Sequence, residues 1–309
     1  MSEPTAGGDL DGLRAGLRRI GPVVVAFSGG ADSAFLAWVA HDTLGPDRVR
    51  CVTAVSPSLA PEELDDCRLL AAEWGLSFLE VLTDELADPA YSANDGSRCF
   101  HCKATLMESL VPIAATSGAA HGGTGGRPAT VVLGVNLDDL GDHRPGQQAA
   151  AEAGARFPLV EAGFTKDGVR AWSRRLGLRT WDKPAAACLA SRVPYGTPVT
   201  LGTLQSVAAA ESALRSLGFG QLRVRHYGDT ARIEVPAEDL AAVVTRRHEV
   251  SGAVHRAGYR YVTVDLDGFR SGNLNDALAD RAQGSEERGD VSEDVGGVPT
   301  GTVASGVHR

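Results

Sequence analysis

A hexapeptide near the start of the chain has the composition of an anion-binding turn. The residues SGGADS at 28–33 follow a short apolar run, 21–27, and precede a helical pattern. A strand-to-helix turn directs free backbone N–H groups and the positive end of a helix dipole at one spot. Adjacent glycines allow close approach to an anion, and Ser28 and Ser33 add hydroxyl donors. The spacing is neither that of the Walker loop nor Gly-x-Gly-x-x-Gly. We expect a phosphate site formed by Ser28, Gly29, Gly30, Asp32 and Ser33.

An acidic segment follows a second apolar run. Asn136, Asp138, Asp139 and Asp142 come directly after residues 130–134. If both runs are strands of one parallel sheet, this segment and the hexapeptide lie at the same sheet edge, where ligands bind. Carboxylates beside phosphates are favourable when they bind Mg²⁺ or are paired. We therefore expect nucleotide contacts here, with a solvated loop as the alternative. The residues concerned are Asn136 and Asp139 for the nucleotide and Asp142 as a candidate Mg²⁺ ligand.

Three cysteines are candidates for metal binding or sulfur chemistry. Cys99 and Cys102 are close enough in sequence to share a metal, and we expect them in one loop. Alone, Cys-x-x-Cys is compatible with zinc, a redox disulfide or an iron–sulfur centre. With Cys188 the set fits a 4Fe-4S cluster that has one iron without a protein ligand. His101 would instead complete a zinc site, and the spacing does not separate the two. The remaining cysteines, Cys51 and Cys67, are expected in the core.

Strands and helices alternate along the first part of the chain. This order predicts an α/β fold with a doubly wound parallel sheet. The expected strands are 21–27, 50–56, 76–82 and 130–134, with a short extended segment at 178–181. The expected helices include 61–74, 102–115 and 169–176.

The pattern changes after residue 200 and predicts a small α+β domain. A helix at 201–217 precedes strands at 221–227 and 231–235, which a Gly-Asp turn joins. A helix at 237–256 and a strand at 259–266 complete the unit. The resulting division is a flexible tail at 1–10, a first domain at 11–185, a C-terminal domain at 186–275 and a disordered acidic tail at 280–309.

Composition and charge exclude several classes of protein. The chain has 309 residues, 43% of them apolar, and a formal net charge of −9 from 30 basic and 39 acidic residues. These values are those of a globular protein and argue against one that coats nucleic acid. No apolar run reaches the roughly 20 residues of a membrane span, and the start of the chain lacks a signal-peptide pattern. We expect a cytoplasmic protein with no membrane or nucleic-acid partner.

The motifs resemble a known family. SGGADS matches the loop of the PP-loop ATP pyrophosphatases (adenine nucleotide α-hydrolase-like enzymes), in which it binds ATP phosphates. Together with RCFHCK, GVNLDDLGDHRPG, KPAAACLASRVPYG and LRVRHYGDTARIEV, in this order, it is similar to the LarE-type ATP-dependent sulfur transferases. The resemblance covers roughly residues 12–275.

The resemblance implies an activity and its cofactors. Such enzymes use ATP and Mg²⁺ to adenylate a carboxylate of a pyridinium dicarboxylate mononucleotide, and then install sulfur to give a thiocarboxylate for the nickel-pincer nucleotide cofactor. Family members form homo-oligomers. In one sulfur route the cysteine matching Cys188 gives up its own sulfur. In the other, cysteines matching Cys99, Cys102 and Cys188 hold a 4Fe-4S cluster that carries sulfide, and this chain has all three. We therefore expect the cluster route.

Further residues are candidates for substrate contacts. Arg223 and Arg225 alternate along an expected strand, so they share one face and suit a phosphate or carboxylate clamp. The alternative is a solvent-facing strand. Glu211 is expected to orient this pair. By position, Ser191 and Arg192 are expected at the substrate and Lys103 at the nucleotide phosphates.

Other functions compete with this interpretation. A tRNA thiolase can combine the same ATP motif with three cysteines, but it needs a basic face that this composition does not offer. An amidotransferase-type ATP pyrophosphatase would leave the cysteines without a role. A nucleotide-binding module without turnover is the third alternative, and pyrophosphate release would exclude it.

Overall fold

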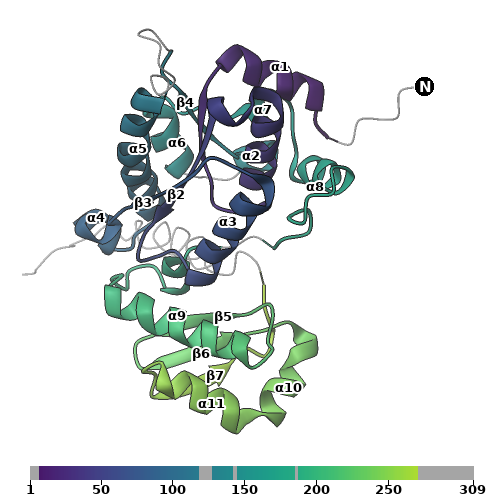
Figure 1. The fold of residues 1–309 in the computed structure, drawn as a ribbon. Coiled ribbons are helices and arrows are strands. Elements are labelled where there is room, and N and C mark those ends of the chain that lie inside the picture. The colour runs from purple at the N-terminus through teal and green to yellow at the C-terminus, as the bar shows by residue number, and fades with distance from the viewer. Residues whose placement is uncertain (1–6, 118–126, 142–144, 185–186, 271–309) are drawn as a thin grey trace, which may run out of the picture. The chain divides into compact units, whose positions relative to one another are not determined.

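A computed structural model describes residues 7–117, 127–141, 145–184 and 187–270. The described residues belong to one compact unit that ends at Arg270 (Figure 1). The expected acidic tail at 280–309 and the candidate Mg²⁺ ligand Asp142 lie outside the described residues.

The first sheet is parallel and places two strand ends side by side. Its strands are β1 (Val23–Ala26), β2 (Val49–Val55), β3 (Phe78–Leu82) and β4 (Thr130–Leu133), in the order β3-β2-β1-β4. Val25 of β1 pairs with Cys51 of β2 on one side and with Val132 of β4 on the other. The chain winds outward from β1 through β2 and β3, and then returns to add β4 on the other side. Ligands of such sheets bind at this switch point.

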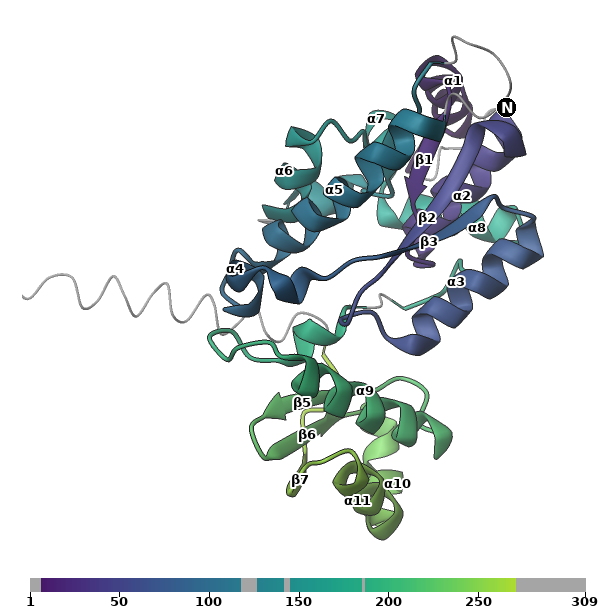
Figure 2. The ribbon, with the colours of Figure 1, turned by 60° about the vertical axis from the view of Figure 1, so that its left-hand side comes forward.

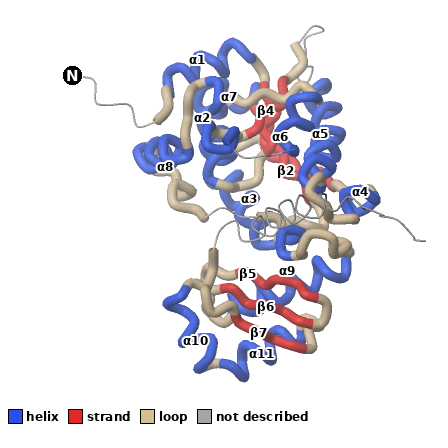
Figure 3. The backbone as a smooth tube through the Cα atoms, turned by 180° about the vertical axis from the view of Figure 1, so that it is seen from behind, coloured by secondary structure: helices blue, strands red, loops and turns tan. Residues whose placement is uncertain are grey.

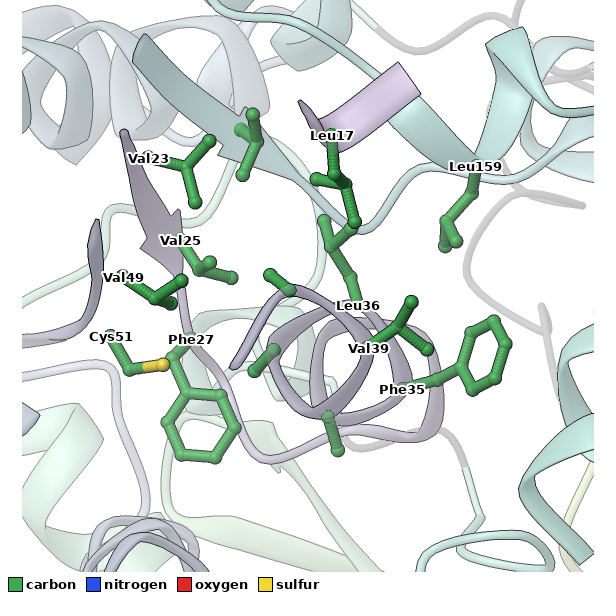
Figure 4. Packing of buried hydrophobic residues seen from close by; sticks show 14 of the residues in the cluster. Leu17, Val23, Val25, Phe27, Phe35, Leu36, Val39, Val49, Cys51 and Leu159 are labelled. Atoms are coloured by element: carbon green, nitrogen blue, oxygen red, sulfur yellow. The ribbon is translucent and has the colours of Figure 1, made fainter. Parts of the chain in front are cut away.

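Helices cover both faces of this sheet, as Figures 1 and 2 show. One core contains Leu17 of α1 (Leu10–Ile20), Phe35 of α2 (Ala31–Leu44), Leu70 of α3 (Pro61–Trp74) and Val169 of α8 (Lys166–Arg175), packed on β1 and β2. Figure 4 shows part of this cluster around Val25 and Leu36. The other core contains Leu110 of α5 (Arg98–Ser117) and Ala150 of α6 (Pro145–Glu152). The doubly wound α/β prediction is confirmed.

The second sheet belongs to the C-terminal part. The antiparallel strands β5 (Arg223–Tyr227) and β6 (Thr230–Glu234) form a hairpin, and β7 (Tyr261–Val264) pairs in parallel with β6 (Figure 3). The turn between β5 and β6 is Gly228-Asp229, where Gly228 has φ +60°. The helices α9 (Leu201–Ser216), α10 (Leu240–Thr245) and α11 (Arg247–Arg256) pack on this sheet through a core that contains Leu214, Val243 and Val254. The predicted α-β-β-α-β order is confirmed.

Short elements complete the described chain. They are α4 (Pro89–Ser92), α7 (Pro158–Glu161) and the 3-10 turns η1 (Pro46–Arg48), η2 (Glu85–Ala87), η3 (Leu137–Gly141), η4 (Leu189–Arg192) and η5 (Ala237–Asp239). Among the helices that the structure describes, none is both long and apolar enough to cross a bilayer.

Two predicted elements differ in the structure. Residues 178–181 form turns, because the N–H of Leu178 bonds to the carbonyl of Ser173 and that of Trp181 to the carbonyl of Leu178. The single helix predicted at 237–256 is divided at Arg246, whose ψ is 24°. The side chain of Arg246 donates to the carbonyl of Leu217, 2.6 Å away, and this tertiary contact accompanies the break.

A third difference concerns the Cys-x-x-Cys pair, which lies on a helix and not in a loop. Helix α5 begins at Arg98, so Cys99 and Cys102 belong to its first turns. The helix begins before residue 102, where the apolar pattern predicts its start, and Asp95 stabilises this earlier beginning. Its carboxylate accepts from the N–H of Ser97 at 2.8 Å and from the Ser97 hydroxyl at 2.6 Å. Polar side-chain bonds of this kind replace the missing helical partners at an N-terminus.

Candidate functional site

The predicted phosphate turn connects the end of β1 to the start of α2. The hydroxyl of Ser33 accepts from the N–H of Ser28 at 3.2 Å and is 3.0 Å from the Ser28 hydroxyl, which closes the turn. Gly29 has φ +67°, and a Cβ there would lie 2.9 Å from the sulfur of Cys67. Gly30 caps α2 without a side-chain bond. The turn therefore presents a helix N-terminus without a side-chain cap, which is the arrangement that binds anions.

The acidic segment meets the phosphate turn at the switch point. The side-chain amide of Asn136 donates to Asp32 at 3.1 Å, although 104 residues separate the two in sequence. Gly134 permits this approach, because a Cβ there would lie 2.7 Å from the backbone nitrogen of Ser33. Asn136 is fully buried, and its side-chain oxygen Oδ1 accepts from the backbone N–H groups of Asp138 and Asp139. The predicted nucleotide residues of both segments are thus neighbours.

Charges around Asp32 were only partly anticipated from the sequence. Burial raises the pKa of the Asp32 carboxyl, and the Asn136 hydrogen bond and the cations of Lys166 and Arg170 oppose this shift. Both cations come from α8, which sequence analysis did not associate with the site. Asp139 raises the Asp32 pKa through charge repulsion, and it accepts from the N–H of Asn136 at 3.1 Å. The site therefore combines acidic groups with nearby cations, as a bound metal–triphosphate requires.

Lys183 is a half-buried cation beside the phosphate turn, and sequence analysis did not select it. Its Nζ is 2.8 Å from Glu63 and 2.5 Å from Asp66, both on α3. It is also 3.7 Å from the position that a Cβ on Gly29 would occupy. Lys183 therefore connects α3, the phosphate turn and the segment leading to Cys188. Lys103 lies on α5, and its side chain is beside Gly146 of α6. Lys103 makes no ion pair within the described residues.

The segment that carries Cys188 is held by backbone and arginine contacts. The N–H of Leu189 donates to the carbonyl of Ser58 at 2.8 Å. Arg192 donates to the carbonyl of Ala187 at 2.7 Å and to that of Cys188 at 3.2 Å. The Ser191 hydroxyl also donates to the Cys188 carbonyl, at 2.7 Å. These bonds fix the backbone at Cys188 while its side chain stays exposed.

Glu211 organises a buried cluster of arginines. Its carboxylate accepts from Arg192 at 2.8 Å, from Arg215 at 2.9 Å and from the N–H of Val224 at 3.1 Å. Because Glu211 is fully buried, the paired charges compensate its desolvation. The expected orienting role thus takes a different form: the direct ion pairs are to Arg192 and Arg215, and the contact to β5 is through its backbone. The prediction that Arg192 and Ser191 contact substrate stays a prediction.

Arg223 and Arg225 are buried and not solvent-facing. Arg225 donates through Nε to both oxygens of Glu234 at 3.0 Å and through Nη1 to the carbonyl of Ser191 at 2.8 Å. Its Nη2 is buried without a hydrogen-bond partner in the described residues. Glu234 was missed by sequence analysis, although an acidic residue opposite Arg223 in the predicted hairpin was a usable signal.

Within the described residues, Arg223 makes fewer polar contacts than Arg192 or Arg225. Its guanidinium stacks 4.6 Å from the ring of Phe269, and no ion pair to it is recorded in the described part of the chain. Burial, followed by repulsion from Arg192 and Arg225, lowers the pKa of Arg223 to about 10. An anion bound here would relieve this repulsion, so the cluster is suited to a phosphate or carboxylate group.

The three candidate cysteines share one electrostatic neighbourhood. Burial raises the pKa of the Cys102 thiol to about 12, and negative charges on Cys188, Glu85 and Cys99 add to the shift. The Cys102 sulfur is 3.9 Å from Glu85. Cys99 and Cys188 are both exposed. Cys102 also packs against a buried cluster that contains Leu189 and Ala190, the two residues after Cys188. The structure therefore brings the Cys188 segment to the helix that carries the pair, although the two come from distant parts of the sequence. As expected, Cys51 and Cys67 are buried core residues.

Three cysteine thiols are chemically suitable ligands for an iron–sulfur cluster, but in the described structure the side chains are not arranged as a metal site. Within the described residues, no group of three or more His, Cys, Asp or Glu side chains is arranged to hold an ion. His101, the alternative zinc ligand, pairs instead with Asp88 at 2.9 Å. Cys99 and Cys102 lie at i and i+3 of one helix, and the role of these two and Cys188 as cluster ligands stays a prediction.

Sequence comparisons find relatives of this chain in other organisms. An uncharacterised protein of Synechocystis sp. is 44% identical over 271 residues, which cover 87% of this chain and 97% of the relative. A pyridinium-3,5-bisthiocarboxylic acid mononucleotide synthase of Lactiplantibacillus plantarum is 41% identical over 266 residues, or 86% of this chain and 93% of the synthase.

The chain belongs to the LarE-type sulfur transferases. A more distant relative, an uncharacterised protein of Methanocaldococcus jannaschii, is 24% identical over 249 residues, or 81% of this chain and 91% of the relative. No protein-family model matches the chain. Membership in the LarE-type family confirms the resemblance drawn from the motifs. It also identifies the chain as an enzyme and agrees with ATP-dependent chemistry at the β1 switch point.

Proposed function

We propose that this protein is an AMP-forming sulfur transferase that converts a carboxylate of a pyridinium dicarboxylate mononucleotide to a thiocarboxylate. The observation that carries the proposal is the 41% identity to a pyridinium-3,5-bisthiocarboxylic acid mononucleotide synthase across 93% of that enzyme. The joined phosphate turn and Asn136 segment support an ATP site. The partly unpaired arginines of β5 support a site for an anionic substrate.

The reaction consists of two substitutions. A carboxylate oxygen of the substrate attacks the α-phosphorus of ATP, the bond to the β-phosphate bridge breaks, and pyrophosphate leaves. A sulfur nucleophile then attacks the activated acyl carbon, and the bond to AMP breaks. Adenylation is required because a free carboxylate is a poor electrophile with no good leaving group. The residues that we propose around the triphosphate are Ser28, Gly29, Gly30, Asp32, Ser33, Lys103, Asn136 and Asp139, with Mg²⁺ and Asp142 beside them.

The arginine cluster is the proposed site for the substrate phosphate. Arg223 has no recorded ion pair in the described residues, and Nη2 of Arg225 is buried without a partner, so both have donors for an added anion. Glu211 and Glu234 keep the cluster folded by compensating its charge, while Ser191 and Arg192 connect it to the Cys188 segment. A phosphate bound to Arg223 would thus lie near the cysteine that takes part in sulfur transfer.

We further propose that Cys99, Cys102 and Cys188 hold a 4Fe-4S cluster. The packing of Cys102 against Leu189 and Ala190, which follow Cys188, and the exposure of Cys99 and Cys188 support this. When bound, the cluster would supply the sulfur nucleophile from added sulfide. The second candidate is sacrificial: Cys188 attacks the acyl carbon, AMP leaves, and elimination across the Cα–Cβ bond of Cys188 releases the thiocarboxylate and leaves dehydroalanine. The exposed Cys188 side chain favours keeping this candidate.

The decisive experiment combines turnover with analysis of the protein. Anaerobically purified protein is incubated with ATP, Mg²⁺, sulfide and the dicarboxylate mononucleotide, and pyrophosphate, AMP and thiocarboxylate are quantified. Iron, an intact Cys188 peptide and multiple turnovers would establish the cluster route. Dehydroalanine at residue 188 and a single turnover without iron would establish the sacrificial route. Absence of pyrophosphate release with this substrate would contradict the proposed function, and salt-sensitive binding of tRNA would favour a tRNA thiolase.

A further inference from the structure

A buried arginine lies between the two segments that supply the cysteines. Arg98 is the first residue of α5, immediately before Cys99, and only 4% of its surface is exposed. Its Nη1 donates to the carbonyl of Ala190 at 2.8 Å, two residues after Cys188. Its guanidinium also lies 5.3 Å from the centre of the Tyr195 ring. One side chain therefore contacts the Cys188 segment at two points.

Asn94 fixes this arginine and extends its contacts. The side-chain oxygen of Asn94 accepts from Arg98, and its side-chain nitrogen donates to the carbonyls of Pro194 at 2.9 Å and Thr197 at 2.8 Å. Asn94 is fully buried with φ +57°, a conformation that non-glycine residues seldom adopt. Such a conformation persists only where the surroundings impose it. The N–H of Gly196 adds a bond to the Asn94 carbonyl at 2.9 Å.

The charge on Arg98 is not explained by helix stability. A cation at the first residue of a helix opposes the helix dipole, and its burial has a further desolvation cost. The described residues record no carboxylate partner for it. Its recorded contacts are instead to Asn94, to the carbonyl of Ala190 and to the Tyr195 ring, so the geometry relates Arg98 to the Cys188 segment.

We propose that Arg98 is a positioning residue for sulfur transfer: its guanidinium, locked by Asn94, holds the Cys188 segment against the helix that carries Cys99 and Cys102. The inference rests on the proposed function for its role in the reaction. Its geometric part, the closeness of Cys188 to the α5 pair, stands independently. Loss of Arg98 should separate the cysteines without altering the phosphate turn, to which Arg98 makes no recorded contact in the described chain.

The test uses Arg98→Met, which keeps the apolar stem, and Arg98→Lys, which keeps the charge but not the planar fork. Arg68→Met is the matched control, since Arg68 pairs with Glu80 and Asp65 on the surface. The first readout is crosslinking of the metal-free protein by dibromobimane, with the joined peptides identified by mass spectrometry. We expect the Cys188 peptide joined to the Cys99–Cys102 peptide in wild type and Arg68→Met, and at least about fivefold less in Arg98→Met.

The second readout compares the two half-reactions. We expect pyrophosphate release within about twofold of wild type in Arg98→Met, and thiocarboxylate formed per pyrophosphate reduced at least about tenfold. Arg98→Lys should fall between the two in both readouts. Equal crosslinking and an equal product ratio in Arg98→Met and wild type would overturn the proposal, and so would a proportional loss of both half-reactions.

The proposal can still be tested in two further cases. If Arg98→Met does not fold, as judged by circular dichroism and thermal unfolding, Arg98→Lys and Asn94→Gly decide the question, since glycine accepts φ +57° but removes the amide. In Asn94→Gly, a wild-type crosslink yield overturns the proposal and a reduced one supports it. If wild-type protein releases no pyrophosphate, the proposed function fails, while the crosslinking comparison still tests the placement of Cys188.

Discussion

Asn136 and Asp32 are 104 residues apart in sequence, and the 3.1 Å hydrogen bond between their side chains joins the two loops of the nucleotide site. The bond spans the switch point of the sheet, from the end of β4 to the first turn of α2. Because Asn136 also accepts from two backbone N–H groups, a single buried side chain determines the conformation of the second loop and its distance from the first.

Replacing Asn136 by Ala should therefore disable adenylation. The change leaves the N–H of Asp138 without its acceptor and Asp32 without its donor, so we expect a loss of about 1–3 kcal/mol in unfolding free energy. Pyrophosphate release should fall at least about tenfold. Urea unfolding and a pyrophosphate assay measure the two effects. Gln148→Ala, at an exposed amide bonded to Glu152, is the control, and equal activity in both variants would contradict the assignment.

Close approach of the two loops also requires Gly134. A methyl group there would lie 2.7 Å from the backbone nitrogen of Ser33, and backbone cannot yield as a flexible side chain does. For Gly134→Ala we expect about 1–3 kcal/mol of destabilisation and loss of pyrophosphate release. Gly96→Ala is the control, since its Cβ would meet open space at an ordinary φ. A fully active Gly134→Ala protein would show that the loops separate without consequence.

Removing the charge of Glu211 should destabilise the C-terminal part and impair sulfur transfer. Glu211→Gln leaves Arg192 and Arg215 without their buried partner, for which we expect about 3–5 kcal/mol of lost stability. Asp42→Asn, which breaks the more exposed pair with Arg14, should cost no more than about 1 kcal/mol. Denaturant unfolding compares them. A similar small effect in both variants would mean that the Glu211 pairs contribute little.

Arg223 provides a test of substrate recognition. For Arg223→Gln we expect the KM for the mononucleotide to rise roughly tenfold or more, which corresponds to the loss of ~1.5 kcal/mol from a charged hydrogen bond. A substrate analogue lacking the phosphate should be processed equally by variant and wild type. Arg260→Gln, at an exposed arginine immediately before β7, should match wild type. If the analogue is affected as strongly as the mononucleotide, the phosphate is bound elsewhere.

The buried Cys67 predicts a loss of stability at alkaline pH. Burial raises the pKa of its thiol from 9.0 to about 11. The unfolded chain therefore releases this proton first, so the contribution is complete below pH 9 and is lost as the pH rises towards 11. At pH 10 the loss from Cys67 is about 1.4 kcal/mol. Cys51, with a pKa raised to about 12 by burial, should contribute in the same direction.

The measurement is the free energy of unfolding between pH 8 and 10.5. Cys67→Ser removes the titrating group, so the decline should be shallower than in wild type, with the remainder due to Cys51. The slope is the readout, since the substitution also changes the stability at pH 8. Identical slopes in the variant and wild type would exclude Cys67 as a source of the pH dependence.

Local sequence was sufficient to predict the sheet, the motifs and the family. Runs such as Val23–Val25 are β-branched and uninterrupted, which only a doubly covered strand tolerates. The hexapeptide at 28–33 carries its anion-binding groups in contiguous residues, so the motif could be recognised without knowledge of distant contacts. The hairpin turn at Gly228 is similarly encoded by neighbouring residues.

Tertiary structure decided which charges meet and where helices end. Glu234 joins Arg225, Lys183 joins Glu63 and Asp66, and Arg98 joins the carbonyl of Ala190, yet none of these pairs has a fixed spacing in sequence. Likewise, polar contacts of Asp95 start α5 before its apolar pattern begins. Periodicity reports which face of an element is apolar, whereas a buried ion pair depends on two elements packing together, and that information exists only in the folded chain.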